Sequence, residues 1–345
     1  MSTTVRNRIA VASGLRSNAA PLAVAFLIMA AGMPAQAATT ITFDVPGATN
    51  TQPAAINDNG AITGMFTSGK VHRFGFVRAP DGTFETFHVE NPHGGGERHT
   101  YPVGINHDGA IAGYYQVRHK NPHGFIRNPH GGITLFDVPG AYYTKPAGID
   151  DNGAVAGQYG SDSGEHGFVR APDGTVTSFD VPGAIVTSVS AVNGKAEISG
   201  TYEVTDGASD GFVRSPDGTI TTYDVNGQNA TYAGGIAANG AVTGFYINGN
   251  DDSGFVRTRD GKIMTFDGQG AYFTGGTAID GSGTVVGEFD AGDGEHAFLR
   301  SKTGKIIVID VPNEGLNNPA AINKDGVVTG GCYDANGFHG FIRTP

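Results

Sequence analysis

The sequence has little or nothing of several features that mark common classes of protein. It contains one cysteine and no tryptophan, and only 16% of its residues are charged. The single Cys332 excludes an internal disulfide and a paired-cysteine zinc motif. No phosphate-binding loop ending in Gly-Lys-Ser or Gly-Lys-Thr occurs, so the signature of P-loop nucleotide enzymes is missing. The absence of tryptophan disfavours a lectin, although 12 tyrosines offer other rings for stacking.

Glycine, by contrast, is abundant. The sequence has 55 glycines, and no helical periodicity stands out after residue 40. Such a composition is typical of many short strands joined by tight turns. A chain of 345 residues is long enough for two ordinary domains or for one large all-β domain. We therefore expect an all-β fold.

The first 37 residues have the composition of a signal peptide. Three arginines precede the apolar run PLAVAFLIMAAGM, and Ala35-Gln36-Ala37 matches a small-residue cleavage site. We predict cleavage after residue 37, which leaves residues 38–345 as a single secreted or periplasmic domain; a retained signal anchor is the alternative. Loss of the three arginines would change the formal net charge from −11 to −14. A surface with this much negative charge repels nucleic acid and anionic lipid, so we expect no nucleic-acid partner and no membrane insertion of the mature chain.

A phrase built on Gly-Phe-Val-Arg recurs along the rest of the chain. Its arginines are separated by 49, 43, 44, 43, 43 and 43 residues. Repeats of this size are typical of four-stranded propeller blades, so we predict a seven-bladed β-propeller. The repeated arginines are Arg78, Arg127, Arg170, Arg214, Arg257, Arg300 and Arg343.

Each repeat predicts four strands, and in the first they are residues 51–57, 61–66, 74–79 and 84–89. Hairpin tips such as NDNG and PDGT supply the positive φ that tight turns need. The seventh repeat ends without a fourth strand, whereas residues 39–48 (TTITFDVPGA) read as a fourth strand without a repeat. We expect this N-terminal strand to complete the last blade by pairing near Phe341, because closure hides the sheet edges.

Other repeated residues are interpreted as scaffold. A glycine in each second strand indicates close approach of a neighbouring backbone or ring. We expect the aspartates after the fourth strands, replaced once by His88, to pair with the repeated arginines. Histidines at the start of four third strands are interpreted as hydrogen-bonding residues. The glycines are Gly64, Gly113, Gly157, Gly200, Gly244, Gly287 and Gly330; the aspartates are Asp44, Asp137, Asp180, Asp224, Asp267 and Asp310; the histidines are His123, His166, His296 and His339.

The recurring HGFVR and HAFLR segments, together with the pattern DGTxTxFDVPGA, resemble the HAF-repeat family of secreted bacterial proteins. The resemblance covers nearly all of residues 39–345. It implies an extracellular, propeller-like protein and no defined activity.

Function is expected on the face formed by the loops between second and third strands and between successive repeats, since these loops vary while the hairpin tips are uniform. A threonine recurs where each innermost strand begins, with asparagine in the seventh repeat, and we interpret it as structural. The residue after it differs in every repeat, either for function or by drift, except that tyrosine occurs twice. These variable residues are Gln52, Tyr101, Lys145, Ser188, Tyr232, Gly275 and Asn318.

The second repeat contains an insertion, residues 90–101 (ENPHGGGERHTY), which explains its longer spacing. The insertion, the loop that follows it and the neighbouring repeat place titratable side chains on the variable face. The candidate catalytic residues are His93, His99 and Tyr101. The candidate ligand-binding residues are Glu97, Arg98, Arg118, His119, Lys120, Tyr142, Tyr143, Lys145 and Tyr232.

Four interpretations of this cluster stay open. Its cations and tyrosines could bind an acidic or sugar-like small molecule, a glycan or a protein. A histidine or tyrosine base could abstract a proton next to a carboxylate, with Arg98 or Lys145 stabilising the charge, as a carbohydrate-active lyase requires. Three histidines, His93, His99 and His119, could bind a metal, although their spacing matches no compact motif. The fourth interpretation is a solvated polar loop without chemistry.

The acidic loops at residues 248–253 and 290–296 could coordinate Ca²⁺ through oxygen atoms, but they lack the full pattern of an EF-hand loop. No cofactor is required by the sequence. We expect an exported propeller that binds an extracellular ligand on its variable face, with the lyase as the alternative.

Overall fold

The computed structural model describes residues 38–345 apart from residues 70–71, 91–97, 118–119, 206, 228–229 and 312–314. The predicted signal peptide therefore lies outside the described residues. Every regular element that the described residues form is a β-strand. Within the same residues, no helix has the length and hydropathy of a membrane span.

The strands follow one another as antiparallel meanders of four, which we call blades. Blade 1 contains β2 (Asn50–Ile56), β3 (Ile62–Ser68), β4 (His72–Arg78) and β5 (Phe84–Phe87). Blade 2 contains β6 (Arg98–Ile105), β7 (Ile111–Val117), β8 (Pro122–Arg127) and β9 (Ile133–Phe136). Blade 3 contains β10 (Tyr143–Ile149), β11 (Val155–Ser161), β12 (Gly164–Arg170) and β13 (Val176–Phe179).

The second half of the chain repeats this order. Blade 4 contains β14 (Val186–Val192), β15 (Ile198–Glu203), β16 (Ser209–Arg214) and β17 (Ile220–Tyr223). Blade 5 contains β18 (Thr231–Ile236), β19 (Val242–Asn248), β20 (Asp251–Arg257) and β21 (Ile263–Phe266). Blade 6 contains β22 (Phe273–Ile279), β23 (Val285–Asp290), β24 (Glu295–Arg300) and β25 (Ile306–Val308).

The terminal blade is assembled from both ends of the described chain. It contains β26 (Leu316–Ile322), β27 (Val328–Asp334), β28 (Gly337–Thr344) and the N-terminal strand β1 (Thr39–Phe43). β1 runs antiparallel to β28, with Thr42 opposite Phe341. The expected pairing of the N-terminal strand near Phe341 is therefore confirmed. Elsewhere, one parallel residue pair joins the third strand of a blade to the first strand of the next blade. These pairs connect blades 1 and 2, blades 3 and 4, and blades 5 and 6 into eight-stranded sheets.

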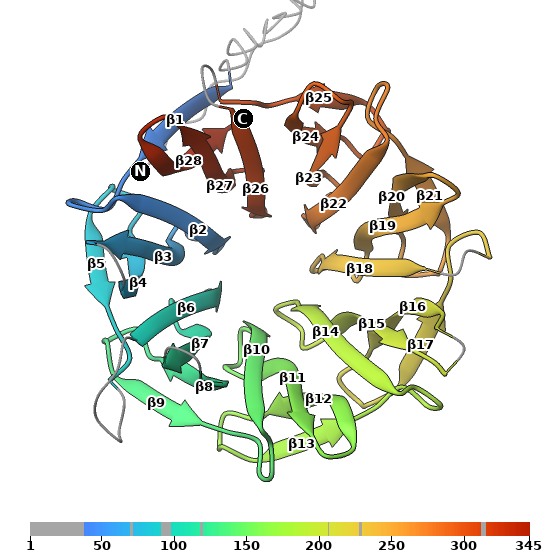
Figure 1. Ribbon diagram of the computed structural model, residues 1–345, viewed down its shortest axis with the longest axis horizontal. Coiled ribbons are helices and arrows are strands. Elements are labelled where there is room, and N and C mark those ends of the chain that lie inside the picture. Colours follow the sequence, from blue (N-terminus) through green and yellow to red (C-terminus); the bar gives the residue numbers. More distant parts are fainter. Residues whose placement is uncertain are drawn as a thin grey trace, which may run out of the picture. The chain divides into compact units, whose positions relative to one another are not determined.

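The blades are arranged around a central axis with their first strands innermost (Figure 1). The first strand of each blade contacts the first strand of the next, and β26 of the terminal blade contacts β2 of blade 1. Strands distant in sequence thereby line one central channel.

Each blade buries the phenylalanine of its repeated phrase completely, as at Phe125 and Phe341. The second-strand glycine makes this possible. A Cβ atom on Gly113 would lie 2.6 Å from Phe125 Cζ and 2.3 Å from the Tyr101 carbonyl oxygen. The predicted close approach at these glycines is confirmed, because no real side chain tolerates such distances.

The repeated arginines do not pair with the repeated aspartates, so that prediction is wrong. Each arginine from blade 1 to blade 6 lies over an aromatic ring of the preceding blade's fourth strand, as Arg170 does over Phe136 at 5.1 Å. The aspartate instead accepts a hydrogen bond from the third-strand histidine, as in His166 Nδ1 to Asp180 at 2.9 Å. Strand register explains the difference, because Arg170 lies opposite Val176 at the far end of the hairpin.

The histidines therefore have the hydrogen-bonding role expected of them. His123, His296 and His339 repeat the arrangement, and the last of these bonds Asp44 at 2.8 Å and so links β28 to the segment after β1. Where His88 replaces the aspartate, Phe74 replaces the histidine and the two rings pack edge to face.

The threonine at the start of each innermost strand is structural, as predicted. Thr100 and Thr144 are fully buried, and their hydroxyls accept hydrogen bonds from the backbone amides of Val89 and Val138 at 3.0 Å. In the terminal blade, Asn317 accepts the same bond from Val311 at 2.9 Å. This bond fixes the start of the strand and hence the direction of the variable residue that follows.

Candidate functional site

The middle of the central channel is apolar. It holds a cavity of about 380 Å³ lined by alanine, glycine, valine and isoleucine, with Ser190 and Thr277 as its polar side chains. Among the residues that the structure describes, no ionisable side chain lines this cavity. The charged side chains described in the channel lie at its two ends.

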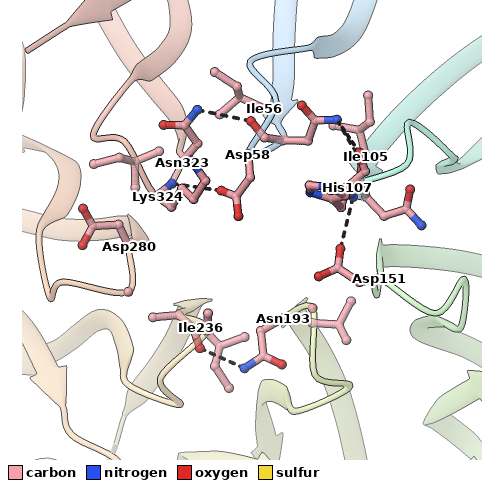
Figure 2. A pocket seen from close by; sticks show the side chains of 18 of the residues that line it. Ile56, Asp58, Ile105, His107, Asp151, Asn193, Ile236, Asp280, Asn323 and Lys324 are labelled. Carbon is pink, nitrogen blue, oxygen red and sulfur yellow. Dashed lines mark hydrogen bonds between the residues drawn. The ribbon is translucent and has the colours of Figure 1, made fainter. Parts of the chain in front are cut away.

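One end lies among the hairpin tips between first and second strands, where a cavity of about 270 Å³ opens (Figure 2). Most of its polar groups form hydrogen bonds between neighbouring blades. Asn57 Nδ2 donates to the Asn106 carbonyl at 3.0 Å, and Asn323 Nδ2 donates to the Asn57 carbonyl at 3.2 Å. The Lys324 amide also donates to the Asp58 carboxylate at 3.0 Å, across the junction between the terminal blade and blade 1. This end is therefore scaffold.

The other end carries the variable residues, and four of its side chains form a continuous band that we call the cation–tyrosine arc: Arg73, Tyr101, Tyr114 and Lys145. Arg73 Nη1 donates to Tyr101 Oη at 2.9 Å. The Tyr101 and Tyr114 rings stack with centroids 4.7 Å apart and planes 20° apart. Lys145 Nζ lies 5.6 Å from the Tyr114 ring centroid. Burial, with the neighbouring Tyr101, raises the pKa of Tyr114, so this ring stays neutral.

A separate carboxylate of blade 3, Glu165, is hydrogen-bonded through both of its oxygen atoms. Glu165 accepts hydrogen bonds from the Tyr143 and Ser188 hydroxyls and, at 3.0 Å, from Gln158 Nε2. Burial first, and then the bond to Glu165, raises the pKa of Tyr143 far above its usual range. Tyr143 therefore acts as a neutral donor and not as a base.

The structure places the remaining candidates at different distances from the arc. The His99 ring lies beside Tyr101, with centroids 6.2 Å apart. Tyr142 is 51% exposed on the loop before β10, and its carbonyl accepts a bond from Asn121 at 2.9 Å. Lys120 is exposed on the same loop of blade 2 as Asn121. The loops of blades 2 and 3 thus meet as the sequence predicted.

Several predicted residues fall where the structure gives no side chain. His93, Glu97, Arg118 and His119 lie outside the described residues, and Arg98 opens β6 with its backbone opposite Val117. Two of the three histidines considered for a metal are in this group.

The residues that are described hold no group of three or more histidine, cysteine or acidic side chains arranged for a metal ion. In the acidic loop near residue 290, the Asp290 carboxylate accepts hydrogen bonds from the Gly292 amide at 2.7 Å and the Tyr272 hydroxyl at 2.5 Å.

Tyr232 does not belong to the arc, although sequence reasoning placed it in the same set. It lines a separate cavity of about 140 Å³ with Phe245, Phe273 and Glu288, which we call the aromatic pocket. The Tyr232 and Phe245 rings stack at 4.8 Å, and Phe245 meets Phe273 edge to face at 5.6 Å. Burial and then the charge of Glu295 raise the pKa of Glu288.

Sequence reasoning missed the partners that second strands contribute. Tyr114 lies opposite Tyr101, Phe245 opposite Tyr232, and Glu288 opposite Gly275. The available signal was the residue directly after the repeated second-strand glycine, which varies from blade to blade as strongly as its first-strand partner. These second-strand residues are Met65, Tyr114, Gln158, Thr201, Phe245, Glu288 and Gly331.

One serine motif of the sequence lies where the structure does not support catalysis. Residues 207–211 (GASDG) match the Gly-x-Ser-x-Gly spacing of a nucleophile elbow. Ser209 is 6% exposed and opens strand β16. A nucleophile elbow needs an exposed serine on a turn between a strand and a helix, so the match is one of spacing alone.

No family model matches the chain, and no curated protein sequence does. Among solved structures, a catalytically inactive virginiamycin B lyase from Staphylococcus aureus with quinupristin is similar with a TM-score of 0.61 at 15% identity, covering 89% of this chain and 99% of that one. The β-propeller domain of the Trilobed protease from Pyrococcus furiosus has a TM-score of 0.60 at 11% identity, with 86% and 94% covered.

The fold is a β-propeller. An acylaminoacyl peptidase from Pyrococcus horikoshii is also similar, with a TM-score of 0.55 at 9% identity, covering 83% of this chain and 51% of that one. At such identities the likeness shows the fold alone, since propellers carry many unrelated functions. The activity has to be argued from the side chains of this chain.

Proposed function

We propose that the chain is an exported, closed seven-bladed propeller of the HAF-repeat type that binds an acidic or sugar-like extracellular ligand through the cation–tyrosine arc. The repeat period, the pairing of β1 with β28 and the contact between β26 and β2 support the closed ring. The N-terminal arginines, apolar run and cleavage site support export.

The observation that carries the binding proposal is a pair of cations to which the described part of this acidic protein offers no acidic partner. Among the described residues, no carboxylate forms an ion pair with Arg73 or Lys145. Arg73 lies over the Tyr101 ring and Lys145 over the Tyr114 ring, at the two ends of the stack. Two cations that can donate charge-assisted hydrogen bonds, with tyrosine hydroxyls and rings beside them, are the groups that bind an acidic sugar.

Exposed apolar side chains favour the same face. Tyr142, Ile185 and Tyr272 are about half exposed on the loops that enter first strands, at 51%, 50% and 51%. Ile247 and Tyr333, at the ends of second strands, add to the same rim. Loops that present such side chains on a rigid scaffold are suited to contact a partner or a large glycan.

The test uses residues 38–345 and a uronate oligosaccharide such as oligogalacturonate, with binding measured by titration calorimetry. Lys145→Ala and Arg73→Gln should each weaken binding about tenfold, the scale of one charge-assisted hydrogen bond. Lys302→Ala, on a hairpin tip at the other end, is the control and should bind as the unmodified chain does. Equal binding by all four proteins, or no binding of any acidic sugar, would refute the proposal.

A lyase is the second candidate, and the Arg73 to Tyr101 hydrogen bond is the observation that favours it. A tyrosine can serve as a base, and a guanidinium beside it is placed to stabilise the charge that forms on the substrate. Incubation with acidic polysaccharides should then produce the ultraviolet absorbance of an unsaturated sugar. Tyr101→Phe should abolish this product while ligand binding persists; absence of product from the unmodified chain excludes the activity on those substrates.

A further inference from the structure

The aromatic pocket differs from the arc in both position and charge. It is formed by β18, β19, β22 and β23 of blades 5 and 6, and no residue of the arc lines it. Its walls combine three aromatic rings with one carboxylate. Its volume is about 140 Å³.

Gly275 is part of the pocket lining and adds no side chain to it. Gly275 occupies the variable first-strand position at which other blades carry side chains such as Tyr101 and Lys145. A Cβ atom there would lie 3.0 Å from Phe273 Cζ, so the Phe273 ring occupies space that a side chain would otherwise fill. The cross-strand neighbour of Gly275 is Glu288, which lines the same pocket.

The Glu288 carboxylate has no partner in the part of the chain that the structure describes. No hydrogen bond or ion pair joins it to another described residue, and the charge of Glu295, which has the same sign, raises its pKa after burial. A half-buried carboxylate normally gains a hydrogen bond or a cation, since burial without one is unfavourable. The ring faces beside it are electron-rich and attract cations as well.

We propose that the aromatic pocket binds an organic cation, an alkylammonium group whose charge faces Glu288 and whose carbon atoms contact the three rings. The carboxylate supplies the negative charge that attracts the ammonium group. Aromatic faces within about 6 Å of the cation add a cation–π attraction. The site does not rest on the binding of an acidic ligand at the arc. A ligand with both charges would engage both sites at the same end of the channel.

The experiment compares choline with its neutral carbon analogue 3,3-dimethylbutan-1-ol, titrated into residues 38–345 and followed by calorimetry or proton NMR. The measurement is made at about pH 8, because burial and Glu295 raise the pKa of Glu288 and the carboxylate must be ionised. Choline should bind at least about tenfold more tightly than the alcohol. Equal binding of the two, or no binding of choline, overturns the proposal.

Two variants locate the site, and a third separates it from the arc. Glu288→Gln keeps the shape of the side chain and should abolish the preference for choline over the alcohol. Gly275→Leu should fill the pocket and prevent both from binding. Lys145→Ala should leave choline binding unchanged. An undiminished preference in Glu288→Gln overturns the assignment even if Gly275→Leu does not fold, and circular dichroism with melting curves establishes which variants are folded.

The source of the ammonium group is distinguished by a second probe, Nα-acetyl-lysine amide. Tighter binding of this probe than of choline supports a lysine side chain from a protein partner. Tighter binding of choline supports a methylated free amine. Either order supports the site, provided that Glu288→Gln weakens the binding of the preferred probe.

Discussion

Closure by the N-terminal strand can be tested by truncating the two side chains that anchor it. The Phe43 ring lies under the Arg78 guanidinium at 5.0 Å and meets Phe76 edge to face. Val45, two residues later, is 1% exposed in a core cluster with Ile56 and Phe76. The perturbation is the double variant Phe43→Ala/Val45→Ala in residues 38–345.

The expected magnitude follows from these contacts. Truncation of a fully buried phenylalanine costs about 3–5 kcal/mol, and the half-buried Phe43 belongs at about the lower limit. Loss of two methyl-sized groups at Val45 costs about 1.5 kcal/mol more. The double variant should therefore lose about 4.5 kcal/mol of unfolding free energy, a large share of the 5–15 kcal/mol of a typical domain. In a chain of this size, the melting temperature should fall by roughly 8 °C.

The assay is urea unfolding followed by circular dichroism, together with amide exchange in β1. The matched control is Phe136→Ala/Val138→Ala, at the equivalent positions of blade 2, where the fourth strand is continuous with the third. Both variants should lose similar stability, but only the N-terminal one should accelerate exchange at residues 39–43, because a chain end can detach alone. Unchanged stability and unchanged exchange in the N-terminal variant would refute the closing role of β1.

Deletion of residues 39–47 removes the closing strand completely. The deletion exposes the edge of β28, so we expect loss of a single cooperative transition. Appending residues 39–48 after Pro345 through an Asp-Gly turn should restore cooperativity, since the strand then follows β28 as fourth strands do in other blades. An unchanged melting curve for the deletion would contradict the proposed closure.

Two further predictions concern the scaffold. Gly244→Ala should destabilise the chain by about 3 kcal/mol in urea unfolding, because its Cβ would lie 2.0 Å from the Tyr232 carbonyl oxygen, whereas Gly281→Ala, with no atom within 4 Å, should be nearly neutral; equal effects would contradict the steric argument. The hydrogen bond to Asp310 raises the pKa of His296, so this pair adds stability that is complete below about pH 6.5 and is lost as pH rises through the raised pKa. His296→Gln should accordingly lose more stability at about pH 5.5 than at about pH 8.5, and a loss independent of pH would contradict it.

The fold was largely predictable because its information is local and repeated. Tight-turn residues mark the hairpin tips, and the unpaired fourth strand at one end matches the missing strand at the other. One scaffold prediction was wrong, namely the pairing of the repeated arginines with the repeated aspartates. Equal numbers of opposite charges suggest such pairs but do not specify the strand register. Register places Asp180 beside His166 and places Arg170 at the other end of its hairpin.

The candidate site was predictable only in part. The variable first-strand position correctly pointed to Tyr101 and Lys145, which both belong to the arc. Their contacts Arg73 and Tyr114 were missed, since Arg73 comes from the preceding blade and Tyr114 from a strand interpreted as scaffold. Tyr232 was assigned to the same cluster as Tyr101 although it lines a different pocket, because a repeat position specifies depth in the channel but not the neighbouring side chains.

By itself, the sequence determined the strand order, the turns, the buried threonines that begin the innermost strands and the partner of the N-terminal strand. Alternation of side chains, turn chemistry and repetition determine these features because each acts within one blade or at its edge. Only the tertiary structure decided that Arg73 and Lys145 flank a tyrosine stack and that Glu288 lines an aromatic cavity. Those contacts join side chains of different strands and blades, and the rotation between blades that brings them together is not encoded in any single repeat.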